Sequence, residues 1–77
     1  MKIEILGTGC PKCEELAKNA KAAVEELGLA AEVSKVTDIV EIANRGVMMT
    51  PALAVDGDIK LVGKVAKVDE LKAIFTS

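Results

Sequence analysis

The chain has 77 residues, 51% of them hydrophobic with Phe75 as the only aromatic residue, and its 10 basic and 12 acidic residues give a net charge of −2. The absence of histidine excludes Cys-His proteolysis, histidine-based acid/base chemistry and zinc sites that need imidazole. Without Trp or Tyr to stack bases, and with its charges scattered, the chain is not expected to bind nucleic acid. Its length predicts a single domain over residues 1–77, near the size at which core burial only just offsets chain entropy.

The first elements that the sequence predicts are a short strand and a long helix. Lys2–Leu6 is a mostly apolar run that favours a buried strand. Thr8-Gly9 forms the following loop, and a helix then runs to about Leu27, where Gly28 ends it. The helix carries an apolar stripe at helical spacing, formed by Cys13, Leu16, Ala17, Ala20, Val24 and Leu27.

The chain has two cysteines, in the motif Cys10-Pro11-Lys12-Cys13 at the predicted start of this helix. Pro11 suits the first helical position, so Cys10 falls at the N-cap. There its sulfur can accept hydrogen bonds from backbone N–H groups and faces the positive end of the helix dipole, and both effects favour the thiolate. Cys13 lies on the apolar stripe and points toward the core. We therefore predict that Cys10 attacks a disulfide and that Cys13, the shielded thiol, resolves the mixed disulfide.

The middle of the chain predicts a second strand and a second helix. Ala31–Val36 contains several polar residues, which suggests a strand at the edge of a sheet. Asp38, followed three residues later by Glu41, predicts a capping box at the start of a helix that stops at Gly46. The apolar residues of this helix are Ile39, Ile42 and Ala43.

The last third of the chain predicts a hairpin and a third helix. Ala52–Val55 and Ile59–Val62 form antiparallel strands joined by a tight Asp56-Gly57 turn. A helix follows from about Lys67 and directs Val68, Leu71, Ile74 and Phe75 toward the core. The whole chain thus predicts an α/β fold with the order βαβαββα.

A strand, then Cys-X-X-Cys at a helix start, then Thr50-Pro51 leading into a ββα unit resembles the thioredoxin fold over nearly the whole chain. The short form is similar to small prokaryotic thioredoxin-like and glutaredoxin-like proteins. The resemblance implies a mixed four-stranded sheet in the order 4-3-1-2, helices on both faces, and a cis peptide bond before Pro51. It also implies that Thr50 and Pro51 lie beside Cys10, where the backbone of Thr50 pairs with the substrate chain.

The chain departs from the family's patterns at several positions. Gly9 precedes the first cysteine where typical thioredoxins have Trp, and the pair Pro11-Lys12 looks more like glutaredoxin than thioredoxin. Glutaredoxins hold glutathione with paired glycines after the last strand, whereas only Gly63 stands here. The buried acidic residue that assists proton transfer in large thioredoxins has no assigned counterpart, and Glu4 is given no role.

Together, the motif and the resemblance predict a thiol-disulfide oxidoreductase that reduces protein disulfides with Cys10 and Cys13 and needs no bound cofactor. Its expected partners are disulfide-containing proteins and an upstream donor, either a reductase that uses flavin or a small thiol. We expect a monomer. We also expect it to be cytoplasmic and without membrane association, because the chain lacks a signal-peptide pattern and a run of apolar residues long enough to span a bilayer.

Two alternatives remain open from the sequence. A copper-chaperone-type domain would use the same two cysteines to bind Cu(I), with the ferredoxin-like order βαββαβ. Such domains have Met two residues before the first cysteine, where this chain has Thr8, and Pro51 has no part in that scheme. A non-catalytic module built on the thioredoxin fold is the other alternative. Of Met48 and Met49, which lie near the predicted site, we expect at least one in the core.

Overall fold

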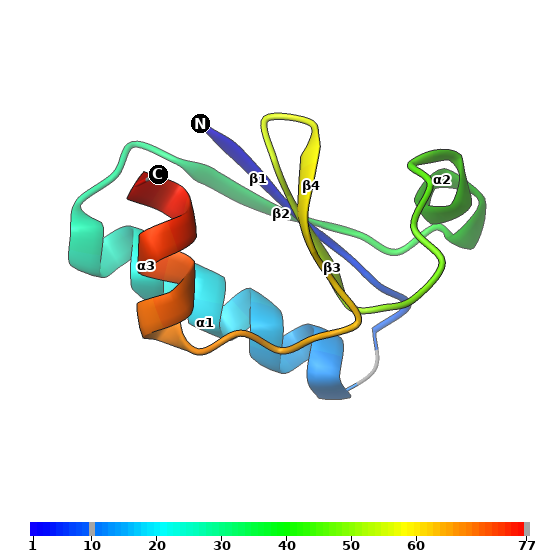
Figure 1. Ribbon diagram of the computed structural model, residues 1–77, viewed down its shortest axis with the longest axis horizontal. Helices are drawn as coiled ribbons and strands as arrows, with labels where there is room; N and C mark the ends of the chain where they lie inside the picture. The colour runs from blue at the N-terminus through cyan, green and yellow to red at the C-terminus, as the bar shows by residue number, and fades with distance from the viewer. Residues whose placement is uncertain (10, 77) are drawn as a thin grey trace.

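The structure, a computed structural model, describes residues 1–9 and 11–76, and Figure 1 shows a central sheet with helices packed around it. The elements follow one another in the predicted order βαβαββα. The strands are β1 (Lys2–Leu6), β2 (Glu32–Val36), β3 (Ala52–Val55) and β4 (Asp58–Val62). The helices are α1 (Pro11–Leu27), α2 (Ile39–Asn44) and α3 (Val68–Thr76).

The sheet is four-stranded and mixed, with the strand order β2-β1-β3-β4. Strand β1 runs parallel to β2 and antiparallel to β3, and β3 runs antiparallel to β4. This is the order 4-3-1-2 that the resemblance implies, and it leaves β2 at an edge, as predicted. Strand β2 begins one residue later than predicted, at Glu32, and β4 begins one residue earlier, at Asp58.

Helices cover both faces of the sheet (Figure 1). Helices α1 and α3 pack against one face, where their apolar residues meet Ile3 and Ile5 of β1 and Leu53 of β3. Helix α2 lies over the other face and encloses a smaller cluster, formed by Leu6, Ile42, Val47, Ala52 and Ala54. Because side chains alternate along a strand, Glu4 and Leu6 point to the face that carries α2.

Helix α1 buries the predicted stripe except for Leu27, which is partly buried against the core, and the helix ends where the sequence indicates. Its buried residues are Cys13, Leu16, Ala17, Ala20, Ala23 and Val24. At the C-terminal end, Gly28 has a φ of 65°, and the Leu29 N–H donates to the Val24 carbonyl at 3.1 Å. The Gly28 N–H donates to the Glu25 carbonyl at 3.2 Å, which completes a Schellman motif. Pro11 is the first helical residue, as predicted.

Helix α2 is short and has a defined start. Asp38 is its N-cap, and the carboxylate of this residue accepts a hydrogen bond from the Val40 N–H at 2.9 Å. The prediction of a full capping box was only half right, because the Glu41 carboxylate pairs with Arg45 at 3.3 Å. Within the helix only Ile42 is buried.

The end of α2 is also a Schellman motif. Gly46 has a φ of 77°, and its N–H donates to the Ala43 carbonyl at 3.0 Å. The Val47 N–H donates to the Ile42 carbonyl at 3.4 Å, and both of these side chains belong to the smaller cluster. The chain therefore leaves α2 in a fixed direction, toward Thr50 and the start of β3.

The predictions for the hairpin turn and for the last helix are confirmed. Asp56 and Gly57 both have positive φ, 51° and 90°, which is the conformation of the type I′ turn that Asp-Gly favours. In α3, Leu71 and Phe75 are buried, and the other predicted apolar positions, Val68 and Ile74, pack against the larger cluster. None of the helices within residues 1–9 and 11–76 has both the length and the apolar character needed to cross a membrane.

Candidate active site

Cys13 lies in the first turn of α1 and is buried, with 4% of its surface exposed. Its side chain contacts the backbone of Gly7, the residue that follows β1. A Cβ atom at residue 7 would overlap the Cys13 sulfur and would lie 3.0 Å from the Cys13 Cβ. The Gly7 N–H donates to the Val36 carbonyl at 2.9 Å, which ties this backbone to β2. Cys10, the predicted attacking thiol, lies outside the described residues, so its role stays a prediction.

The loop before β3 also approaches Gly7, the residue that Cys13 contacts. Leu6 at the end of β1 is paired with Ala52 at the start of β3, and the two strands are antiparallel. The residues just after β1 and just before β3 therefore emerge together at one edge of the sheet. A Cβ atom at Gly7 would lie 3.9 Å from the Thr50 Cβ, so Thr50 and Cys13 approach Gly7 together.

The Thr50–Pro51 peptide bond is cis, as the resemblance implies. Thr50 is exposed, whereas Pro51 is fully buried. The Pro51 carbonyl accepts a hydrogen bond from the Gly63 N–H at 2.8 Å, which joins this loop to the end of β4. Two of the predicted site positions, Cys13 and Thr50, are thus close in space although they are far apart in the sequence.

The methionines next to this loop are placed differently from the prediction. Met48 is 91% exposed and Met49 is 61% exposed, so the expectation that at least one lies in the core is wrong. Val47 occupies the inward position of this segment, and it is 6% exposed. Met49 instead covers Gly63, where an added Cβ would lie 3.2 Å from the Met49 Cε. Gly63 has a φ of 68°, and this left-handed conformation favours glycine at the position.

A cavity of about 230 Å³ opens beside Thr50, between α2 and the loops that follow β1 and α2. We call it the α2 groove. Its lining is mostly apolar and consists of Thr8, Ile39, Ile42, Ala43, Val47, Met48 and Thr50. Ile39, one of the apolar residues of α2, is 69% exposed. The groove could not be predicted from the sequence. Apolar residues at helical spacing give the same pattern whether they line a groove or pack in the core.

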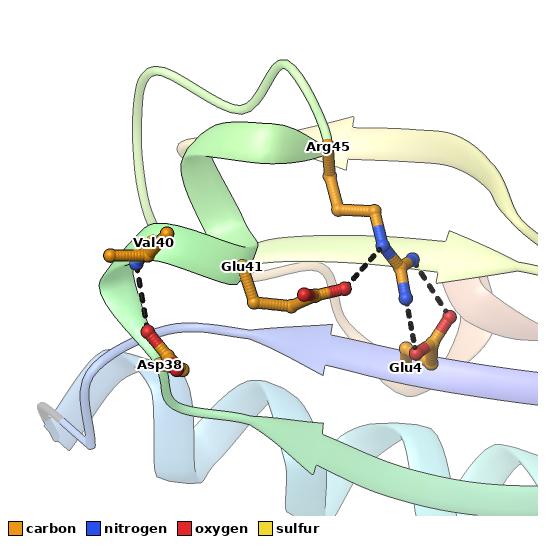
Figure 2. A network of polar contacts seen from close by, with 5 residues as sticks. All are labelled: Glu4, Asp38, Val40, Glu41 and Arg45. Atoms are coloured by element: carbon orange, nitrogen blue, oxygen red, sulfur yellow. Dashed lines mark hydrogen bonds and ion pairs between the residues drawn. The ribbon is translucent and has the colours of Figure 1, made fainter.

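Glu4 is the buried charged residue of β1, with 5% of its surface exposed. Figure 2 shows the guanidinium of Arg45 reaching it from the end of α2. The two groups form two hydrogen bonds of 2.9 Å each, and Arg45 also contacts Glu41. The hydrogen bond from Arg45 lowers the pKa of Glu4 below its ordinary value, against the opposing effect of burial, and the Glu4 carboxylate raises the pKa of Arg45.

The fold does not support the metal-chaperone alternative. That alternative requires the order βαββαβ, whereas the chain has βαβαββα with α2 in place of a strand.

Comparisons with known proteins agree with this architecture. The family model described as the thioredoxin domain matches residues 1–76. A thioredoxin from Methanothermobacter thermautotrophicus is 47% identical over 76 residues, which cover 99% of both chains. A thioredoxin from Methanocaldococcus jannaschii is 53% identical over 70 residues, which cover 91% of this chain and 80% of that one. The chain therefore belongs to the thioredoxin family of redox proteins.

Proposed function

We propose that this protein reduces disulfide bonds in protein substrates with the dithiol of Cys10 and Cys13. The observation that supports this proposal most directly is the meeting of Cys13 and Thr50 at Gly7. A buried thiol in the first turn of a helix, beside an exposed stretch of backbone, suits a reaction in which a bound chain is attacked and then released.

The reaction consists of two thiol-disulfide exchanges. The Cys10 thiolate attacks one sulfur of the substrate disulfide, that S–S bond breaks, and the departing sulfur takes up a proton. Cys13 then gives up its proton, and its thiolate attacks the Cys10 sulfur of the mixed disulfide. The second substrate thiol leaves, and the protein retains a Cys10–Cys13 disulfide. The substrate gains two electrons, which a flavin-dependent reductase or a small thiol restores to the protein.

The substrate segment lies along Thr50 in this proposal. Pro51 already uses its carbonyl to bind Gly63, whereas the neighbouring Thr50 is exposed. An extended peptide could pair with the Thr50 backbone as an added strand does. The α2 groove opens next to Thr50, so an apolar side chain of the same substrate segment could enter it.

The direct test is reduction of insulin in the presence of dithiothreitol. Cys10→Ser should abolish turnover, because the attacking sulfur is gone. Cys13→Ser should instead accumulate mixed disulfides with the substrate, which mass spectrometry detects after acid quenching. A Cys10→Ser protein that still reduces insulin would refute the mechanism.

The equilibrium of the dithiol separates this proposal from metal handling. The chain has no tryptophan to report the redox state, so thiol alkylation followed by mass measurement is the readout. A reversible two-electron transition with a reduction potential of about −270 mV, the value for thioredoxin, would support a disulfide reductase. Failure to form the disulfide, together with tight Cu(I) uptake, would favour metal binding by the same cysteines.

A further inference from the structure

Two exposed methionines come directly before Thr50 in the chain. Met48 is 91% exposed and Met49 is 61% exposed, although apolar side chains of this size are usually buried. Oxidation turns the apolar thioether of methionine into a polar sulfoxide, and oxidants dissolved in water reach exposed side chains first. Both methionines are therefore open to this modification, and both lie at the edge of the sheet where Cys13 and Thr50 approach Gly7.

Met49 lies along the backbone of Gly63 at the end of β4. An added Cβ at Gly63 would lie 3.3 Å from the Met49 Cβ, 3.6 Å from its sulfur and 3.2 Å from its Cε, so the whole side chain follows this residue. The Gly63 N–H donates to the Pro51 carbonyl at 2.8 Å. Met49 thus covers the residue that ties the Thr50–Pro51 loop to β4.

Met48 has different surroundings. It belongs to the lining of the α2 groove, but at 91% exposure its side chain is almost entirely in water. An oxygen added to its sulfur would be hydrated at little cost. An oxygen on the Met49 sulfur would instead lie beside the Gly63 backbone, where one side of the sulfur is shielded from water, and a polar group without its hydrogen bonds is costly there. The same modification therefore has different consequences at the two residues.

We infer that Met49 is a modification site, at which a peroxide forms methionine sulfoxide and thereby weakens the reduction of protein disulfides. A lone pair of the Met49 sulfur attacks one peroxide oxygen, the O–O bond breaks, and an S–O bond forms. The sulfur loses two electrons, and hydrogen peroxide takes them up and leaves as water. The change is reversible, because methionine sulfoxide reductases restore the thioether.

The effect on protein substrates rests on the function proposed above, in which the substrate segment lies along Thr50. Hydration of the sulfoxide draws the Met49 side chain away from Gly63. The surface next to Thr50 then loses an apolar side chain, and the loop before β3 loses its contact with the end of β4. A substrate segment beside Thr50 is consequently bound less tightly.

The experiment compares Met49→Leu with Met48→Leu as the matched control, because leucine keeps an apolar side chain that lacks the oxidisable sulfur. Each protein is converted to the Cys10–Cys13 disulfide, treated with hydrogen peroxide, and then reduced with dithiothreitol, so that no free thiol meets the peroxide. Peptide fragmentation by mass spectrometry locates the added oxygen. Titration with 5,5′-dithiobis(2-nitrobenzoate) must still find both thiols of the chain.

We expect the treated wild type and the treated Met48→Leu to carry sulfoxide at Met49. Their kcat/KM for insulin should fall by about threefold to tenfold, mainly through KM, which corresponds to one or two lost methylene contacts. Met49→Leu should keep its untreated kcat/KM although Met48 is oxidised. Treatment with methionine sulfoxide reductases of both stereospecificities should restore the wild type.

Three outcomes would overturn the inference alone. In the first, Met49 stays unoxidised while Met48 and Met1 carry oxygen. In the second, the wild type with sulfoxide at Met49 reduces insulin as well as the untreated protein. In the third, Met49→Leu loses as much activity as the wild type. An untreated wild type that forms no Cys10–Cys13 disulfide or reduces no insulin would overturn the proposed function and this inference with it.

Discussion

The sulfur of Cys13 lies directly against the backbone of Gly7, where even a single added carbon would overlap it. The requirement for glycine at this position is steric, because Gly7 is not among the glycines with positive φ. Neither residue can move aside easily. The Gly7 N–H is bonded to the Val36 carbonyl in the sheet, and Cys13 is held in the first turn of α1. The position of the buried thiol is therefore set by the absence of a side chain in the loop after β1.

Gly7→Ala should destabilise the protein by about 1–3 kcal/mol, the usual cost of forcing an extra methyl group into a packed site. Urea unfolding measures this cost. The same substitution should also slow the release of substrate from the mixed disulfide, because it displaces the Cys13 sulfur. Single-turnover reduction of a peptide disulfide measures the release step separately from the first attack.

A double-mutant cycle with Cys13→Ala identifies the cause of the lost stability. Removing the sulfur relieves the main overlap, so Gly7→Ala should cost less in the Cys13→Ala background than in the wild type. An equal cost in both backgrounds would mean that the contact with the sulfur is not responsible.

The two thiols should differ in their rates of alkylation. Cys13 is 4% exposed, so iodoacetamide should reach it only slowly in the folded protein. At limiting reagent and neutral pH we expect label on Cys10 first, as peptide mapping by mass spectrometry can show. In denaturant both cysteines should react, which serves as the control. Earlier labelling of Cys13 in the folded protein would contradict the predicted roles.

The strands, helices and turns could be predicted because their signals are local. Apolar periodicity placed the buried stripe of α1, Asp38 marked the start of α2, and the Asp56-Gly57 pair marked the hairpin turn. The convergence of Cys13 with Thr50 required the order of the strands, which came from the resemblance rather than from any local pattern.

The ion pair and the groove could not be predicted from local patterns. Glu4 and Arg45 are 41 residues apart in the sequence. Alternation along β1 places Glu4 opposite Ile3 and Ile5, which by itself favours a solvent-exposed carboxylate. The carboxylate is buried only because α2 and the segment after it cover that face of the sheet. Likewise, Ile39 has an apolar side chain whose exposure depends on how α2 lies on the sheet.

The Glu4–Arg45 pair predicts how stability changes with pH. The folded-state pKa of Glu4 is lowered from the ordinary value of 4.5, chiefly by the hydrogen bond from Arg45. The ionised carboxylate therefore contributes stability above that ordinary value, and the contribution is lost as the pH falls through the lower folded-state pKa. Arg45 keeps its charge throughout, because its pKa is raised.

Urea unfolding of the wild type and Glu4→Gln as a function of pH measures this contribution. The wild type should be the more stable protein at neutral pH, and the difference should shrink as the pH falls below 4.5. Glu41→Gln, which leaves the buried pair in place, is the matched control and should follow the wild-type curve closely. A difference between the wild type and Glu4→Gln that does not change with pH would mean that the charge of Glu4 is not what stabilises the fold.

The α2 groove offers a matched pair of exposed apolar residues for testing substrate recognition. Ile39 is 69% exposed and lines the groove, whereas its neighbour Val40 is 63% exposed and lies outside the lining. If an apolar substrate side chain enters the groove, Ile39→Ser removes apolar contact area there. We expect kcat/KM for insulin to fall by about threefold to tenfold, which corresponds to one or two lost methylene contacts.

Val40→Ser should leave kcat/KM for insulin near the wild-type value, although it changes α2 in a comparable way. Both variants should reduce 5,5′-dithiobis(2-nitrobenzoate) at the wild-type rate, because neither residue is part of the dithiol. Equal losses for Ile39→Ser and Val40→Ser would point to a general disturbance of α2 rather than to the groove. A loss confined to Ile39→Ser and to the protein substrate is the result expected if the wall of the groove contacts the chain that is being reduced.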